Sequence, residues 1–138
     1  MYEIVPGLWL SNFLDASKNT PPRAFVVNCT KDLPMISDYG VRIPVDDDLR
    51  TESQHILVQS LPSVIQSIDG VLKNGGKVVI HCWAGQQRSA ATVAAYLMTR
   101  GMSMGHAVEH IRSIKNDAFI NSINFFPALK MFENRRCT

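Results

Sequence analysis

The chain has 138 residues, of which 46% are hydrophobic and 19% are charged, and its formal net charge at pH 7 is +2. This length and composition are typical of one ordinary globular domain, which we expect to cover residues 1–138. The small net charge is too weak to argue for a nucleic acid or a membrane surface as a partner by bulk electrostatics.

Five short segments of the chain have the composition of β-strands. Residues 4–5 and 8–10 flank a Pro-Gly turn and indicate two short strands. Residues 24–29 form a continuous apolar run, which is typical of a buried parallel strand. Residues 41–45 alternate around an arginine and a proline, which favours an edge strand or a strand end. Residues 77–81 follow an Asn-Gly-Gly turn and form the last predicted strand.

Four helices are predicted between and after these strands. Residues 57–72 place apolar side chains at helical spacing, and Pro62 predicts that this helix begins near the proline or bends there. Residues 89–100 form the next predicted helix, which ends before a glycine. Ser103 and Ser122 are the predicted N-caps of the last two helices. Strands that alternate with helices predict an α/β fold with a mostly parallel central sheet of about four or five strands flanked by helices.

The sequence also indicates where the protein resides. No apolar run approaches the length of a membrane span, and the first residues lack the charged and apolar regions of a signal peptide. The three cysteines, Cys29, Cys82 and Cys137, are an odd number without metal-ligand spacing, which fits a reducing compartment. We therefore expect an intracellular, cytoplasmic protein, with a nuclear location left open.

Residues 81–89 read His-Cys-Trp-Ala-Gly-Gln-Gln-Arg-Ser and connect a predicted strand to a predicted helix. Such a loop can turn successive backbone N–H groups inward to bind an anion, and the helix adds the positive end of its dipole. Arg88 can bind two oxygens of a phosphate, and a thiolate at Cys82 is a nucleophile for phosphoryl transfer. The loop therefore predicts a cysteine phosphatase with Cys82 and Arg88 as catalytic residues. The predicted substrate-binding residues are Trp83, Ala84, Gly85, Gln86, Gln87 and Arg88.

The same loop resembles the signature of the protein tyrosine phosphatase superfamily, His-Cys-x-x-Gly-x-x-Arg-Ser/Thr, at every fixed position. Other parts of the chain are similar to the compact dual-specificity phosphatases. These parts are residues 4–12, 26–28, 43–47, 94–98 and 107–125. The resemblance spans essentially the whole chain and implies a protein tyrosine phosphatase-like fold.

The resemblance also implies an activity. It implies hydrolysis of phosphotyrosine, and of phosphoserine and phosphothreonine, in proteins through a phosphocysteine formed on Cys82. Neither a metal nor an organic cofactor takes part in this chemistry, and the implied partner is a phosphoprotein substrate. No nucleic acid or membrane partner is expected, and the oligomeric state is left open.

The leaving oxygen must be protonated, which requires an acid outside the cysteine loop. Asp46, Asp47 and Asp48 follow the predicted strand at residues 41–45. Similar phosphatases carry their acid in an Ile-Pro-Val-x-Asp setting, which assigns the role to Asp47 and leaves its two neighbours as alternatives. Ser89 resembles the hydroxyl residue that assists the departing thiolate when water hydrolyses the phosphocysteine.

Several alternatives remain open at the level of sequence. The substrate can also be a phosphoinositide or an RNA 5′-phosphate, and the loop can serve a phosphate-binding module without turnover. Trp83 forms a wall of the pocket or is buried against the fold. The side chain of Gln87 touches the substrate rim or is simply exposed. Cys29 forms a protective disulfide with Cys82 or is an inert buried thiol.

Overall fold

A five-stranded sheet forms the centre of the computed structural model, which describes residues 1–136. The strand order is β1-β2-β5-β3-β4, in which β2, β5, β3 and β4 are parallel and β1 pairs antiparallel with β2. The strands are β1 (Tyr2–Val5), β2 (Leu8–Ser11), β3 (Phe25–Asn28), β4 (Gly40–Arg42) and β5 (Val78–His81). The predicted α/β class and mostly parallel sheet are confirmed.

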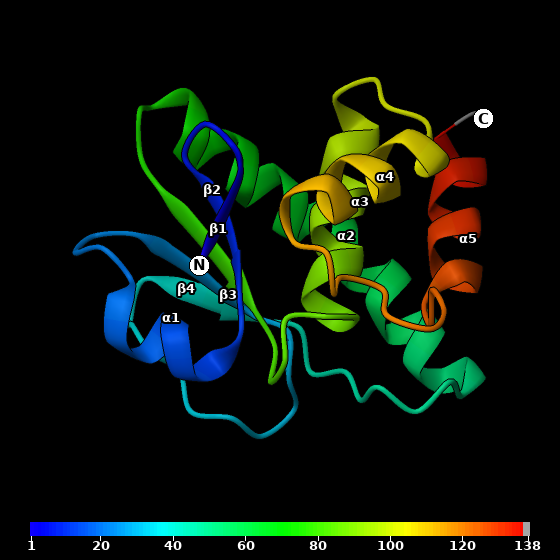
Figure 1. Ribbon diagram of the computed structural model, residues 1–138, viewed down its shortest axis with the longest axis horizontal. Helices are drawn as coiled ribbons and strands as arrows, with labels where there is room; N and C mark the ends of the chain where they lie inside the picture. Colours follow the sequence, from blue (N-terminus) through cyan, green and yellow to red (C-terminus); the bar gives the residue numbers. More distant parts are fainter. Residues whose placement is uncertain (137–138) are drawn as a thin grey trace.

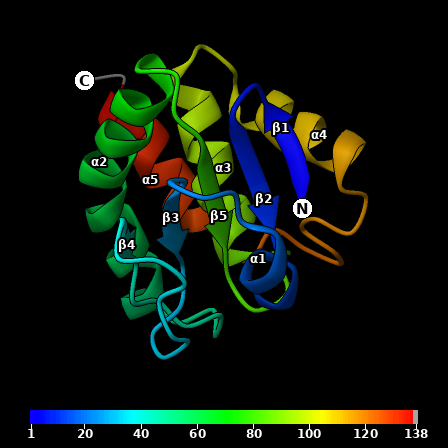
Figure 2. The same cartoon turned by 90° about the vertical axis from the view of Figure 1, so that its left-hand side faces the viewer.

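Helices cover both faces of this sheet, as Figures 1 and 2 show. The helix α1 lies on one face, and the other four helices lie on the opposite face (Figures 1 and 2). The helices are α1 (Phe13–Asn19), α2 (Thr51–Lys73), α3 (Arg88–Thr99), α4 (Met104–Ile114) and α5 (Phe126–Arg136). The four-helix face holds the larger part of the core, and α1 covers a small cluster that contains Ala16, Ala24 and Val79.

Two of the predicted strands are the most enclosed in the sheet. Every residue of β3 and β5 is buried, as expected for parallel strands with helices on both faces. The strand predicted at residues 41–45 lies at the edge of the sheet, as expected, but it is shorter, because β4 covers Gly40–Arg42 and residues 43–45 are outside the sheet. The chain then continues toward the three aspartates outside the sheet.

The helix α3 is the central helix of the larger core. Residues 89–98 are all buried, and α3 packs against β5, α2, α4 and α5. Its small side chains, mostly alanines, allow these elements to approach closely on all sides. Because α3 starts directly after the cysteine loop, the best-packed helix of the molecule fixes one end of that loop.

Three details differ from the sequence-based predictions. The helix α2 begins at Thr51 and continues through Pro62, because Leu57 and Val58 are buried and keep the first turns in place despite the proline. Ser122 is not the N-cap of α5: its hydroxyl donates to Asn124 Oδ1 at 2.5 Å, and the helix begins at Phe126. The predicted cap of α4 is confirmed, since the Ser103 hydroxyl accepts the N–H of residue 106.

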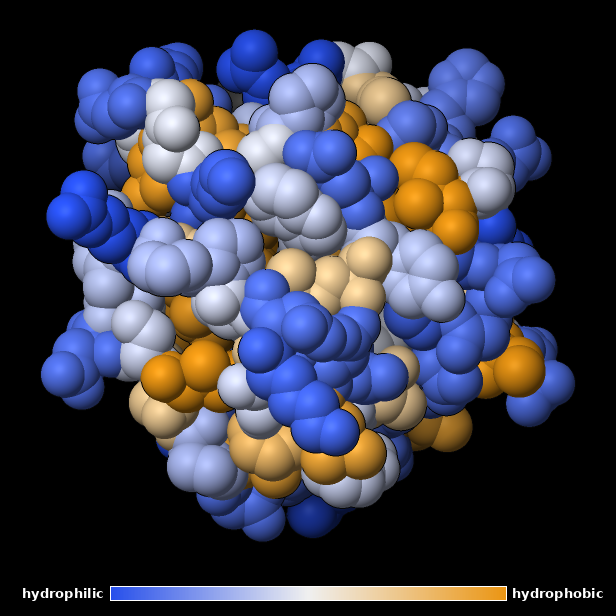
Figure 3. Space-filling view, turned by 60° about the vertical axis from the view of Figure 1, so that its left-hand side comes forward, coloured by the Kyte–Doolittle hydropathy of each residue, from blue (hydrophilic) through white to orange (hydrophobic). Residues whose placement is uncertain are grey.

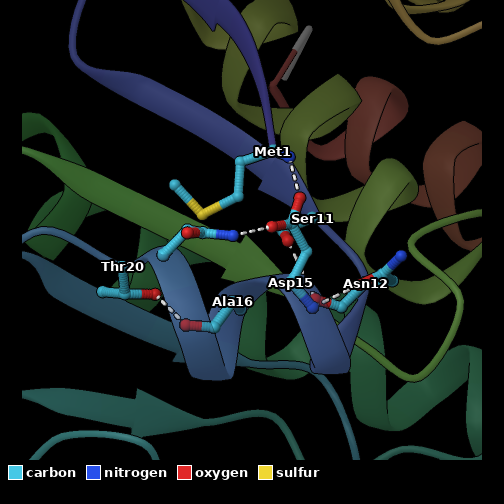
Figure 4. A network of polar contacts seen from close by, with 7 residues as sticks. Met1, Ser11, Asn12, Asp15, Ala16 and Thr20 are labelled. Carbon is cyan, nitrogen blue, oxygen red and sulfur yellow. Dashed lines mark hydrogen bonds and ion pairs between the residues drawn. The ribbon is translucent and has the colours of Figure 1, made fainter.

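The third difference is α1, which sequence periodicity did not predict. It has seven residues and buries one of them, Ala16, so it has no apolar stripe to detect. The side chain of Asn12 caps it by accepting the Asp15 N–H at 2.7 Å, and the Thr20 hydroxyl donates to the carbonyl of Ala16 (Figure 4). The terminal ammonium of Met1 pairs with Asp15 in the same network. Local capping and polar contacts therefore hold this short helix against the sheet.

The surface is mixed in character. On the face shown in Figure 3, hydrophobic groups form separate patches between hydrophilic ones. Among the helices within residues 1–136, none combines the length and apolar character that crossing a membrane requires. Cys137 and Thr138 lie outside the described residues.

Candidate active site

The cysteine loop joins the carboxyl end of β5 to the first turn of α3, as the sequence predicted. Gly85 lies in the middle of this loop with φ of +71°, a conformation that glycine adopts without steric cost. A Cβ atom at this position would lie 2.8 Å from the backbone carbonyl of Ser11 at the end of β2. The loop is therefore packed directly against the neighbouring strand, and residue 85 must be glycine for this approach.

Two hydrogen-bonding groups converge on the sulfur of Cys82, which is 3% exposed. The N–H of Gly85 donates to Sγ at 3.2 Å, and the hydroxyl of Ser89 lies 3.1 Å from it. The sulfur therefore accepts one bond from the backbone and contacts one side-chain hydroxyl, which can act as donor or acceptor. The structure thus brings Cys82 and Ser89 into contact, as their predicted roles require.

Arg88 is the first residue of α3, and its side chain contacts the segment that precedes the three aspartates. Its Nη1 donates to the carbonyl of Val45 at 3.1 Å. This bond uses one of the five N–H groups of the guanidinium. It also fixes the segment that precedes the three aspartates beside the cysteine loop, although Val45 and Arg88 lie 43 positions apart in the chain.

The structure separates the three candidate acids. Asp48 accepts the hydroxyl of Ser53 at 2.6 Å and the N–H of Arg50 at 3.1 Å, and these bonds lower the pKa of its carboxyl. Asp48 is therefore an ionised residue that stabilises the start of α2, which argues against its role as the acid. Asp46 faces Lys31, with 3.7 Å between the charged atoms.

Asp47 instead contacts a segment that itself touches the cysteine loop. Its Oδ1 accepts the side-chain N–H of Asn124 at 2.9 Å. The backbone N–H of Asn124 in turn donates to Oε1 of Gln87, at 3.0 Å. Of the three aspartates, Asp47 is therefore the one that is linked to the cysteine loop through Asn124 and Gln87.

The side chain of Gln87 is buried, with 6% exposure, and does not lie on the substrate rim. Its Nε2 donates to the carbonyls of Ser122 and Ile120 at 2.7 and 3.3 Å, and its Oε1 accepts the N–H of Asn124. Gln86 is also bound to this part of the chain, through Asp117 at 3.1 Å. The two glutamines hold the segment before α5, which is a role that the sequence did not suggest.

Trp83 is exposed beside the nucleophile, which argues against burial against the fold. Its side chain is 53% exposed, and its ring is stacked on Phe13 with 6.1 Å between centroids and 28° between planes. The Phe13 N–H also donates to the Trp83 carbonyl at 2.9 Å. The first residue of α1 thus contacts both the ring and the backbone of Trp83. The Asn12 cap was a signal in the sequence from which this element could be found.

His81 lies at the end of β5, fully buried. Its Nδ1 lies 3.1 Å from the Cys82 carbonyl, and its ring lies 5.7 Å from the ring of Phe13. Burial lowers the pKa of His81, so the imidazole is neutral near pH 7. The His81 ring therefore contacts the backbone of the cysteine loop at its first residues.

Cys29 has the properties of an inert thiol. It is buried, its Sγ lies 3.4 Å from the hydroxyl of Thr92, and burial raises its pKa to about 12. A thiol with this pKa is protonated at neutral pH and reacts slowly in disulfide exchange. Cys29 and Cys82 are both free thiols in the structure. Across residues 1–136, no three His, Cys, Asp or Glu side chains are grouped so that they could hold a metal ion.

Residues 11–135 match the family model described as dual specificity phosphatase, catalytic domain. The chain is 33% identical to the dual specificity protein phosphatase Mpk3 of Drosophila melanogaster, over 96% of this chain and 34% of that protein. It is 26% identical to the serine/threonine/tyrosine-interacting protein of Mus musculus, over 94% of this chain and 65% of that protein. The chain thus spans between about a third and two thirds of the length of these relatives.

Solved structures share the fold. The crystal structure of human DUSP28 has a TM-score of 0.85 at 24% identity, covering 99% of this chain and 98% of that one. The crystal structure of the human tyrosine phosphatase-like serine/threonine/tyrosine-interacting protein has a TM-score of 0.82 at 26% identity, covering 100% and 98%. The predicted protein tyrosine phosphatase-like fold is confirmed.

Proposed function

Because the chain belongs to the family of dual specificity phosphatase catalytic domains, we propose that it hydrolyses phosphotyrosine, and also phosphoserine and phosphothreonine, in proteins. The observation that carries this proposal is the convergence of the Gly85 N–H and the Ser89 hydroxyl on the sulfur of Cys82. A module that only binds phosphate needs a cradle but has no use for a nucleophile prepared in this way.

In the first step, the thiolate of Cys82 attacks phosphorus, so an S–P bond forms and the P–O bond to the substrate breaks. The backbone N–H groups of the loop and the guanidinium of Arg88 bind the three other oxygens, where they meet the charge of the transition state. Asp47 gives its proton to the departing oxygen, which leaves as the hydroxyl of tyrosine, serine or threonine.

In the second step, water attacks the phosphocysteine. The carboxylate of Asp47 takes a proton from this water, the S–P bond breaks, and inorganic phosphate is released. The Ser89 hydroxyl lies 3.1 Å from the sulfur and donates to the thiolate as it departs. Both the acid and the nucleophile then return to their starting states.

The character of the loop supports a substrate with a single phosphate group. Trp83, Ala84, Gln86 and Gln87 are uncharged, so Arg88 is the cation within the loop sequence. A polyphosphorylated inositol ring would place additional anionic groups beside neutral side chains. The exposed ring of Trp83 offers an apolar wall to a peptide or an aromatic side chain.

The test is phosphate release by the purified chain with a metal chelator present. We expect turnover of phosphopeptides with higher kcat/KM than of soluble phosphoinositides or RNA 5′-phosphates at equal ionic strength. Cys82→Ser should lose turnover while it still binds inorganic phosphate, because the loop N–H groups and Arg88 remain. Near-normal turnover by this variant would refute the covalent mechanism, and preference for a phosphoinositide would refute the protein substrate.

A further inference from the structure

We infer that Asn124 is a positioning residue that holds the general acid Asp47 in place, and that Gln87 anchors Asn124 to the cysteine loop. This inference rests on the proposed function. Asp47 is exposed and lies on an irregular segment, so its own position in the chain does not fix the direction of its carboxyl group. The side chain of Asn124 supplies the missing contact, at 2.9 Å, from a part of the chain 77 positions away.

The side-chain amide of Asn124 has a defined orientation. Its Oδ1 accepts the hydroxyl of Ser122 at 2.5 Å, so the amide nitrogen is the atom that faces Asp47. The donor therefore points at the carboxyl group, and it contacts one oxygen, Oδ1. Asp47 Oδ2 is then the oxygen that carries the proton to the leaving group.

The backbone of Asn124 is fixed on both sides. Its N–H donates to Oε1 of Gln87 at 3.0 Å, and its carbonyl accepts Nε2 of Gln54 at 2.8 Å. Both glutamine side chains are buried, and Gln54 also binds the N–H of Ala128 in the first turn of α5. Asn124 therefore moves little relative to α2, α5 and the cysteine loop.

Two connections join the acid segment to the start of α3. Arg88 binds the carbonyl of Val45 directly, and the preceding residue Gln87 binds Asp47 through Asn124. In the proposed mechanism, Arg88 binds the phosphate, and the adjacent residue Gln87 holds Asn124, which positions the acid. The start of α3 therefore sets the distance between the phosphorus of a bound substrate and the proton donor Asp47.

The test is Asn124→Ala with two aryl phosphates that differ in the leaving group. For phenyl phosphate, which needs protonation of its oxygen, we expect kcat to fall about tenfold, because a small misplacement of a reacting group is costly. The leaving group of 2,4-dinitrophenyl phosphate departs as a phenolate and needs no proton from an acid. For this substrate, kcat should remain within about twofold of the wild type. The matched control is Asn134→Ala, which removes an exposed asparagine on α5 and should change neither rate.

A double-mutant cycle with Asp47→Asn tests the route of the effect. If Asn124 acts through Asp47, adding Asn124→Ala to Asp47→Asn should cause no further loss with phenyl phosphate. Equal losses for both leaving groups, or additive losses in the cycle, would overturn the inference and indicate a general structural role.

The failure of the proposed function looks different. A wild-type chain without turnover, or an active Cys82→Ser variant, would overturn the phosphatase mechanism and the positioning role with it. Cys82-dependent turnover combined with leaving-group-independent effects at Asn124 would overturn the positioning role alone.

Discussion

The cysteine loop and the acid segment serve the same proposed reaction but are built in opposite ways. Cys82 and Ser89 are buried and held between the last parallel strand and the central helix. Residues 46–50 are all exposed. Asp46 and Asp47 are each held by one side chain from a distant part of the chain, whereas Asp48 is held by contacts at the start of α2. The comparison teaches that the nucleophile is positioned by the core, whereas the acid is positioned by a few hydrogen bonds.

The largest effect should come from the cysteine-loop side. Arg88→Lys keeps the positive charge but loses the planar pair of donors that binds two phosphate oxygens. It also loses the geometry of the bond to the Val45 carbonyl. We expect kcat/KM for a phosphotyrosine peptide to fall by roughly three decades, as for the loss of a donor to a transition-state oxyanion. A fall of less than tenfold would show that the guanidinium geometry does not matter.

The next effect comes from the acid segment. Asp47→Asn should lower kcat for phenyl phosphate by roughly two decades, and much less for 2,4-dinitrophenyl phosphate. Asp46→Asn is the matched control, because Asp46 pairs with Lys31 at the surface. A larger loss in that control would move the acid role to Asp46.

A smaller effect is expected at the rim of the pocket. Trp83→Ala removes the exposed ring that stacks on Phe13. Aromatic contacts of this kind contribute about 0.5–1.5 kcal/mol, so KM for a phosphotyrosine peptide should rise roughly twofold to twelvefold with kcat little changed. Trp83→Phe keeps a ring and should show a weaker rise. A fall in kcat at unchanged KM would contradict a role in binding.

The smallest effect concerns stability rather than turnover. The bonds from Ser53 and Arg50 hold the pKa of Asp48 below its ordinary value of 3.8. Because the folded-state pKa is lower than the unfolded-state pKa, these bonds stabilise the fold fully at pH values above the unfolded-state pKa. This contribution is lost as the pH falls through the folded-state pKa. Asp48→Asn should therefore lower the urea midpoint slightly at pH 7, with a difference that shrinks toward pH 2. A difference that grows on acidification would contradict this assignment.

The sequence predicted the part of the proposed site whose residues lie close together in the chain. The strand, the cysteine loop and the helix are consecutive in residues 78–99, so their order alone placed Cys82, Arg88 and Ser89 at one site. The continuous apolar run at residues 24–29 likewise identified a central strand. Periodicity and spacing are sufficient to predict a structural element when that element is formed by consecutive residues.

Other features could not be obtained in this way. The helix α1 buries a single residue, so no periodic pattern marks it. Pro62 weakened the prediction of α2, because its local cost is visible in the sequence and the burial that offsets it is not. The inward orientation of the Gln87 side chain likewise depends on carbonyl groups more than thirty residues away.

By itself, the sequence determined the fold class, the cysteine loop and the group of three aspartates from which the proposed acid is drawn. The tertiary structure distinguishes these aspartates by their partners, because Asp48 is bound to the start of α2 and Asp47 faces Asn124. This difference supports the proposal that Asp47 is the acid. The tertiary structure also decided that the ring of Trp83 is exposed and that the side chain of Gln87 is buried. The physical reason is that a hydrogen bond needs two partners in space, and only the folded chain brings partners from distant positions together.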